Sequence, residues 1–376
     1  MNPIQIIFFS VTTLLILVYG GYYLLCYYTA NHKSLKIKKK RKFKPSVSIV
    51  IPTWNEEDTI KGKLKNTLKL KYPNKKLEII VIDSGSTDKT RSIVKKFKGV
   101  RLIVEKKRMG KANALNRVFR KCKGDIVIMS DSDCRLDKNI LEKSMPYFSD
   151  TKIGALTGRQ ILLNPNENIA TKTESEYRNF YFLIRKAESI IDSTIIFHGE
   201  FSAFRKELLE NIYVDSVADD TELALRVRKK NYRALMIWEA IYREYAPDKL
   251  SERIKQKYRR AQGLIQIMSR FFSTFFLNPS YGYFGMLIFP VEFFMHLISP
   301  ILLVIAFITL FFLPLNIFVL IIIGLGITLL IKRTRIFLLT FLHSQYSCLK
   351  GMFHYLFNGS SHSWEKVHGT RRYVDK

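Results

Sequence analysis

The stretch "DIVIMSDSDC", residues 125–134, decides the fold, because it reads as a short apolar strand that ends in two aspartates separated by a serine. Two similar stretches precede it: "SVSIVIP" (46–52) is followed by "TWNEEDTI", and "LEIIVID" (77–83) is followed by "SGSTDKT". Strands that alternate with helices over residues 45–250 predict an α/β domain with a largely parallel sheet. Ligands of such sheets bind beyond the carboxyl ends of the strands. We therefore expect the polar residues after these three strands to meet in one crevice.

Asp131 and Asp133 are the most specific of these polar residues. In an extended loop alternate side chains point the same way, so both carboxylates can approach one divalent cation that also holds phosphate oxygens. A DxD tripeptide alone is a weak signal, and an exposed acidic turn is its ordinary explanation. The motif therefore needs support from the rest of the chain.

The composition limits the classes of function. The chain has 376 residues, 47% of them hydrophobic, and a net charge of +29. This size fits one sizeable soluble domain with membrane segments, and the charge favours anionic partners such as lipid headgroups, nucleic acid or phosphorylated substrates. Four cysteines without CxxC spacing and seven histidines without a ligand pattern argue against a disulfide framework or a structural zinc site.

Residues 1–30 predict a transmembrane anchor. The uncharged stretch 4–28 would span roughly 37 Å as a helix, which is enough to cross a bilayer. A cleaved signal peptide is the alternative, but the basic run lies after the apolar segment, in the juxtamembrane linker 31–44. The positive-inside rule places this linker in the cytoplasm.

A second apolar region, 284–331, predicts a transmembrane hairpin with its turn at 314–316. We expect interfacial helices over 251–283, before the hairpin. Residues 332–376 predict an interfacial helix or a fourth membrane helix, followed by a basic tail. Glu292 and His296 lie one helical turn apart inside the hairpin, either as a local pair that faces other helices or as part of a substrate channel.

Seven motifs, of which the DxD pair is one, follow in order: "SIVIPTWNEEDTI" (48–60), "IIVIDSGSTDKT" (79–90), "GKANALN" (110–116), "IVIMSDSDC" (126–134), "FHGEFSAFRKE" (197–207), "ADDTELALRV" (218–227) and "QKYRR" (256–260). Together the chain resembles a membrane-integrated family 2 glycosyltransferase, similar to the processive hyaluronan, chitin and cellulose synthases. The resemblance covers about residues 45–265. It implies a GT-A catalytic domain, a Rossmann-like fold of nucleotide-diphospho-sugar transferases, over 45–250 and flanking transmembrane helices. It says much less about the sugar or the acceptor.

The resemblance implies a donor site for a nucleotide sugar, with UDP favoured. Asp83 resembles the acid that reads the nucleobase, and Asp131 and Asp133 resemble the ligands of Mg²⁺ or Mn²⁺. Arg259 can offer a forked donor to the diphosphate. The donor-binding residues that it implies are Pro52, Thr53, Asn55, Glu56, Asp83, Lys111, Asp131, Gln256 and Arg259.

The resemblance also implies an inverting mechanism, in which Asp220 is the general base that accepts a proton from the acceptor hydroxyl. A helix cap is the structural explanation of the same acids. Asp219 stands where the family often has glutamate, and Arg260 replaces the tryptophan of the family's QxxRW motif, which weakens the case for processive elongation. The acceptor-side residues that it implies are His198, Gly199, Glu200, Asp219 and Arg260.

Four functions remain open at this point. The first is a processive synthase that extends a polysaccharide, and the second transfers one sugar to a lipid or polyprenyl-phosphate acceptor. The processive synthase needs a membrane channel for its product, and three crossings are few for a channel built by one chain. An oligomer, an interfacial helix or a partner would have to complete it. A membrane-tethered nucleic-acid-binding protein lacks a recognised motif, so we expect no nucleic acid partner. The fourth function is an inactive scaffold that keeps the fold, and the intact acidic residues of the motifs argue against it. We expect a multi-pass protein of the cell membrane that contacts lipids and has a cytoplasmic catalytic domain.

Overall fold

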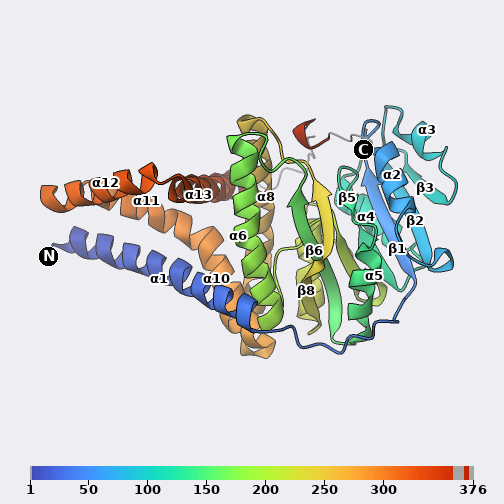
Figure 1. The fold of residues 1–376 in the computed structure, drawn as a ribbon, viewed down its shortest axis with the longest axis horizontal. Coiled ribbons are helices and arrows are strands. Elements are labelled where there is room, and N and C mark those ends of the chain that lie inside the picture. Colours follow the sequence, from blue (N-terminus) through green and yellow to red (C-terminus); the bar gives the residue numbers. More distant parts are fainter. Residues whose placement is uncertain (1, 359–367, 372–376) are drawn as a thin grey trace.

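One eight-stranded sheet organises the computed structural model, which describes residues 2–358 and 368–371. The strand order is β3-β2-β1-β4-β7-β6-β8-β5 (Figure 1). The strands are β1 (Val47–Thr53), β2 (Leu77–Ser84), β3 (Val100–Glu105), β4 (Ile126–Met129), β5 (Arg135–Leu136), β6 (Ile153–Leu162), β7 (Ser202–Arg205) and β8 (Arg233–Glu244).

The sheet is mixed, whereas the sequence predicted a largely parallel one. Strands β3, β2, β1 and β4 are parallel, and so are β6 and β8, but β7 runs antiparallel to β4 and β6, and β5 runs antiparallel to β8. The three predicted strands, β1, β2 and β4, are parallel as expected. No strand was predicted at β5 or β7, whose short sequences carry no sign of their direction. The reversal has a consequence for the site. Ser202 at the start of β7 pairs with Met129 at the end of β4, so the loop before β7 lies beside the DxD pair.

The core fills both faces of the sheet. Alternate residues of β1 point to opposite faces, so that Ile49 and Ile51 belong to one cluster and Val50 to the other. Helices α2 and α5 pack on the first face, and α4 and α7 pack on the second. The helices between β1 and β8 are α2 (Ile60–Leu68), α3 (Thr90–Val94), α4 (Lys111–Phe119), α5 (Ile140–Ser144), α6 (Ile169–Ile191) and α7 (Asp219–Lys229).

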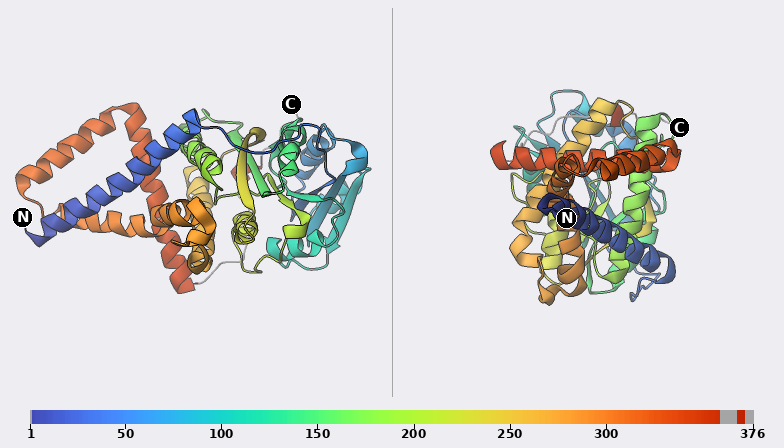
Figure 2. Two further views of the ribbon diagram at one scale, coloured as in Figure 1. Left: turned by 90° about the horizontal axis from the view of Figure 1, so that it is seen from below. Right: turned by 90° about the vertical axis from the view of Figure 1, so that its left-hand side faces the viewer.

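The apolar helices project away from the sheet on one side, and α6 and α8 stand between them and the sheet (Figures 1 and 2). Tyr22 of α1 donates a hydrogen bond of 2.8 Å to Glu188 of α6, which joins the first apolar helix to the catalytic domain. The remaining helices are α1 (Pro3–His32), α8 (Leu250–Arg270), α9 (Phe272–Phe275), α10 (Phe289–Phe293), α11 (Ser299–Leu310), α12 (Leu315–Leu330) and α13 (Lys332–Asn358).

Two helical segments are long and apolar enough to cross a membrane, namely Pro3–His32 and Phe284–Leu310. Side chains on their outer faces, such as Leu24 and Phe307, are exposed, as expected of surfaces that face lipid. The predicted hairpin is only partly reproduced. The chain turns at 311–314, just before the predicted turn, and α12 has 16 residues, fewer than the roughly 20 that a span needs. A third crossing exists only if α12 and α13, bent by 111° at their junction, are counted as one broken span.

Glu292 and His296 are both buried, and their side chains lie 3.3 Å apart. They therefore form a local pair, which was the first of the two interpretations of these residues. His296 also lines the cavity described below, and its part in a substrate channel stays a prediction.

Candidate active site

The DxD loop follows β4 and is anchored from two directions. The N–H group of Asp131 donates to the carbonyl of Gly199 over 3.1 Å, which ties the loop to the segment before β7. From α2, the buried Lys63 donates to Ser130 Oγ over 2.6 Å and to the carbonyl of Cys134 over 3.2 Å. These contacts fix the backbone on both sides of the two aspartates. Sequence analysis missed Lys63, because a lysine on an exposed-looking amphipathic helix gives no sign of burial.

Lys111, at the first position of α4, joins two groups of carboxylates. Its Nζ lies 3.0 Å from Asp131 Oδ1 and 3.3 Å from Asp219 Oδ2. Burial opposes the charge of this amine, but Asp131, Asp219 and Asp220 raise the pKa of Lys111 above its usual value. The amine therefore stays protonated and holds the DxD loop close to the start of α7.

Asp219 and Asp220 occupy the first turn of α7, where negative charge suits the helix N-terminus. The residue at the N-cap position is Ala218, which makes no side-chain cap, and Asp220 Oδ1 accepts only from the adjacent N–H of Thr221, over 2.7 Å. A helix cap therefore does not account for these acids. Burial, followed by the charge of Asp219, raises the pKa of Asp220 to about 7, while Lys111 opposes the shift. A carboxyl with this pKa can accept a proton near neutral pH.

The predicted donor-binding residues at the ends of β1 and β2 lie together. Thr53 pairs with Asp83 across the two strands, directly after Pro52. Asn55 takes a positive φ of 53°, and its Oδ1 accepts the N–H of Thr87 over 2.7 Å, which locks the loop after β1 to the loop after β2. Asp83 Oδ2 accepts from Arg91 over 2.6 Å and from the N–H of Ser86 over 3.1 Å.

Two residues beyond the membrane segments also reach this site. The hydroxyl of Thr370 donates to Asp133 Oδ2 over 3.0 Å, and the guanidinium of Arg371 makes a forked contact with Glu56, with distances of 2.7 and 3.0 Å. The sequence analysis assigned these residues to a basic tail next to the membrane. Nothing in their local pattern distinguishes them from other basic surface residues, so this placement could not be foreseen.

The acids around the DxD pair suit a divalent cation. Burial raises the pKa of Asp133 to about 6; Arg371 opposes this shift, whereas Asp131, Glu56 and Glu200 add to it. Among residues 2–358 and 368–371, no group of three or more His, Cys, Asp or Glu side chains is arranged as a complete metal site. A pair of carboxylates is nevertheless what Mg²⁺ commonly uses when substrate phosphates supply its other ligands. The residues present therefore fit the expected ion.

A cavity of about 720 Å³ is lined by Asp131 and Glu200 but not by Asp133 or Glu56, and it extends to Ser344 and Ser347 of α13. Gly199 lies close to Asp131, because a Cβ atom at this position would stand 2.7 Å from Asp131 Oδ2. Of the predicted residues, Gln256 is buried but does not line the cavity, and neither do those at the ends of β1 and β2. The predicted site residues that do line it are Lys111, Asp131, His198, Gly199, Glu200, Asp219, Asp220, Arg259 and Arg260.

Arg260 occupies the position of the missing tryptophan and is surrounded by acids. Its guanidinium lies 3.9 Å from Glu174, 3.6 Å from Glu200 and 3.7 Å from Glu244. Burial raises the pKa of Glu200 to about 8, and the charge of Glu244 adds to this shift. An aromatic ring at residue 260 would leave these carboxylates without that cation.

Comparisons with known proteins agree with this geometry. The model of the glycosyl transferase family 2 matches residues 48–213. The poly-beta-1,6-N-acetyl-D-glucosamine synthase of Staphylococcus aureus (strain MSSA476) is 29% identical over 241 residues, which are 61% of this chain and 57% of that protein. The probable glycosyltransferase YdaM of Bacillus subtilis (strain 168) is 29% identical over 267 residues, 66% of this chain and 62% of that protein. The match thus spans less than two thirds of either relative.

One solved structure extends the similarity to almost the whole chain. The mannosyltransferase PcManGT from Pyrobaculum calidifontis, in complex with GDP-Man and Mn²⁺, superposes with a TM-score of 0.79 at 28% identity. The superposition covers 94% of this chain and 99% of that one, so it includes the apolar helices as well as the sheet. The chain therefore carries a family 2 glycosyltransferase domain of the GT-A fold, flanked by helices that can span a membrane.

Proposed function

We propose that the protein is a metal-dependent, inverting hexosyltransferase that moves a sugar from a nucleotide-diphosphate donor to a growing polysaccharide at the cytoplasmic face of the membrane. The observation that carries this proposal is the arrangement of carboxylates around one cavity. Asp131 and Asp219 both contact Lys111, which holds the loop of the proposed metal ligands close to the turn of α7 that carries the candidate base Asp220. Polysaccharide as the acceptor is supported by the similarity to a polysaccharide synthase.

In this mechanism the acceptor hydroxyl attacks the anomeric carbon of the donor sugar. The new glycosidic bond forms as the bond between that carbon and the diphosphate oxygen breaks, and the leaving diphosphate keeps the electron pair. Asp220 accepts the hydroxyl proton. Asp131 and Asp133 would hold a Mg²⁺ or Mn²⁺ ion, which supplies positive charge for the diphosphate when bound. Arg259, which lines the cavity near these acids, would add hydrogen-bond donors.

The nucleobase would lie at Asp83. Its Oδ2 is engaged by Arg91 and Ser86, whereas its buried Oδ1 has no hydrogen-bond partner among the described residues. One available carboxylate oxygen suits the single N–H group of uracil better than the paired N–H groups of guanine. We therefore propose a UDP-sugar, although the mannosyltransferase of similar fold was solved with GDP-Man.

A second candidate function, the transfer of one sugar to a lipid or polyprenyl-phosphate acceptor, is favoured by the shape of the cavity. The cavity extends from Asp220 to Ser344 and Ser347 of α13, so an acceptor could enter from the side of the apolar helices. Arg260 supports the same candidate, because its ion pairs fill the place of an aromatic sugar-binding ring.

We further propose a multi-pass protein of the cell membrane with the catalytic domain in the cytoplasm. The support is the basic linker after α1, which obeys the positive-inside rule when it is cytoplasmic.

The test is a donor panel with the purified full-length protein, Mn²⁺ and membrane lipid extract. Radiolabelled UDP- and GDP-sugars are offered in turn, and the products are sized. High polymer supports the synthase, one discrete glycolipid supports single transfer, and the absence of any product with every donor contradicts both. Asp133→Asn should abolish transfer, and Lys255→Met, a charge change elsewhere on the surface, should not.

A further inference from the structure

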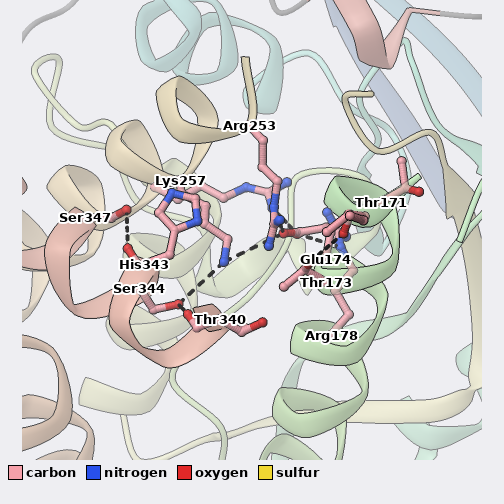
Figure 3. A network of polar contacts seen from close by, with 12 residues as sticks. Thr171, Thr173, Glu174, Arg178, Arg253, Lys257, Thr340, His343, Ser344 and Ser347 are labelled. Carbon is pink, nitrogen blue, oxygen red and sulfur yellow. Dashed lines mark hydrogen bonds and ion pairs between the residues drawn. The ribbon is translucent and has the colours of Figure 1, made fainter. Parts of the chain in front are cut away.

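A cluster of cations, most of them buried, lies on α6 and α8 beside the cavity (Figure 3). Its centre is Glu174 of α6, which is 1% exposed. We call this group the basic cluster, and its members are Arg178, Arg185, Arg253, Lys257 and Arg260.

Four of the five cations share one carboxylate. Glu174 lies 3.0 Å from Arg178 and 3.2 Å from Arg253. Lys257 and Arg260 stand farther away, each at 3.9 Å. Burial opposes ionisation of Glu174, but these cations lower its pKa to about 2. Glu174 is therefore charged at every physiological pH. The two nearer arginines use most of the capacity of this carboxylate to pair with cations.

The acids of the cluster do not balance its charge. Glu200 and Glu244 contribute the other ion pairs, so the four cations around Glu174 face three carboxylates. Arg185 contacts His198 instead. Burying unbalanced charge is costly unless a counter-ion is present. The excess positive charge therefore points to an anionic ligand.

Several nitrogen atoms of the cluster are also without an acceptor. Buried nitrogens of Arg178, Arg185 and Arg253 have no hydrogen-bond partner within residues 2–358 and 368–371. An unsatisfied buried donor is destabilising, so native proteins generally supply it with a protein group, water or ligand. Guanidinium groups match phosphate oxygens in geometry.

The cluster opens into the cavity and toward α13. Arg185, Lys257 and Arg260 line the cavity whose far end holds Asp220. Lys257 Nζ lies 3.5 Å from Ser344 Oγ of α13, a helix that packs against α8, and the amine stands 4.0 Å from the ring of Tyr177. A ligand held by Lys257 would thus be close to a helix that leads to the apolar segments.

We infer that the basic cluster binds the phosphate group of a lipid-linked sugar acceptor, whose sugar reaches Asp220 and whose hydrocarbon chain leaves along α13. The inference rests on the second candidate function proposed above, the transfer of one sugar to a lipid or polyprenyl-phosphate acceptor. A neutral glycan would fill the same space but would leave the charge of the cluster uncompensated. The transfer step itself is unchanged: the sugar hydroxyl loses its proton to Asp220 as the nucleoside diphosphate leaves.

The test measures equilibrium binding of radiolabelled undecyl phosphate to the full-length protein in phosphatidylcholine nanodiscs. Unlabelled undecyl β-glucoside and inorganic phosphate serve as competitors, so that the lipid tail and the free anion are tested separately. Lys257→Met should weaken binding by about tenfold to a hundredfold, and Lys257→Arg should retain it. Lys255→Met, an exposed lysine two residues away on the same helix, is the matched control and should bind like the unaltered protein.

Three results would overturn the inference: undecyl phosphate does not bind, inorganic phosphate displaces it equally well at equal concentration, or Lys257→Met and Lys255→Met bind alike. If Lys257→Met does not fold, as judged by size-exclusion chromatography, Arg185→Gln takes its place with the same expected loss. Binding is measured without a donor, so it is independent of catalysis. A protein that binds undecyl phosphate but transfers no sugar contradicts the proposed function, and one that transfers sugar without this binding contradicts only the inference.

Discussion

Asp220 should set the pH dependence of sugar transfer. A general base acts only when it is unprotonated, and burial together with the neighbouring Asp219 raises the pKa of Asp220 to about 7. The ionised fraction of such a group is about one tenth at pH 6 and about nine tenths at pH 8. We therefore expect kcat/KM to rise roughly tenfold between these two values and to level off above them.

Two substitutions separate the base from its neighbour. Asp220→Asn should lower kcat by about 10²- to 10⁴-fold and remove the dependence on pH. Asp219→Asn should keep the dependence but move it to lower pH, by on the order of one unit, because a negative charge that raises the pKa of Asp220 has been removed. The direction of this shift is the sharper test, because a general loss of folding would not produce it.

The assay is transfer from the radiolabelled donor in detergent micelles, followed from about pH 5.5 to 8.5 at saturating metal. Donor KM is measured at each pH, so that changes in metal or donor binding are not mistaken for changes in the base. Undiminished transfer by Asp220→Asn would refute the assignment. So would a shift of the Asp219→Asn profile to higher pH.

Four further perturbations test other parts of the site. Gly199→Ala should impair transfer and raise the Mn²⁺ concentration needed for half-maximal activity, because the new methyl group meets Asp131 Oδ2 at 2.7 Å. A variant with a normal midpoint of thermal unfolding and a normal dependence on Mn²⁺ would contradict this prediction. Lys63→Met should destabilise the fold by about 1–3 kcal/mol, measured by thermal unfolding, since its buried hydrogen-bond partners lose their donor. Arg371→Ala should lower the free energy of unfolding by about 3 kcal/mol, because it leaves Glu56 buried without its cation. Adding Glu56→Gln should restore part of this loss. An unchanged midpoint of thermal unfolding would show that the contact contributes nothing. Chelation with EDTA should abolish transfer, and added Mn²⁺ or Mg²⁺ should restore it; full activity in EDTA would exclude the metal role.

Much of the catalytic domain could be predicted from sequence because its signals are local. The strands that end at Pro52, Asp83 and Asp131 are short apolar runs followed by polar residues, and the observed β1, β2 and β4 confirm them. Spacing alone placed Asp131 and Asp133 on one loop. The resemblance to family 2 glycosyltransferases is confirmed by the family match and by the fold.

The remaining features depend on contacts between distant parts of the chain. The antiparallel direction of β7 depends on how the chain returns from α6 to the sheet. The four-residue sequence of β7 does not indicate that direction. The burial of Lys63 and the charge balance around Glu174 depend on which helices pack together. The shortness of α12 and the 111° bend between α12 and α13 are likewise features that apolar composition does not reveal.

The contacts of Thr370 and Arg371 have a consequence for biogenesis. These residues follow the apolar helices in the chain, yet they touch Asp133 and Glu56, which precede most of them. A ribosome that has made only residues 45–250 has therefore not yet supplied these parts of the proposed donor site. The site is completed only after the later helices have been synthesised and the chain has returned to the sheet. The order of synthesis would thus delay sugar transfer until the protein is seated in its membrane.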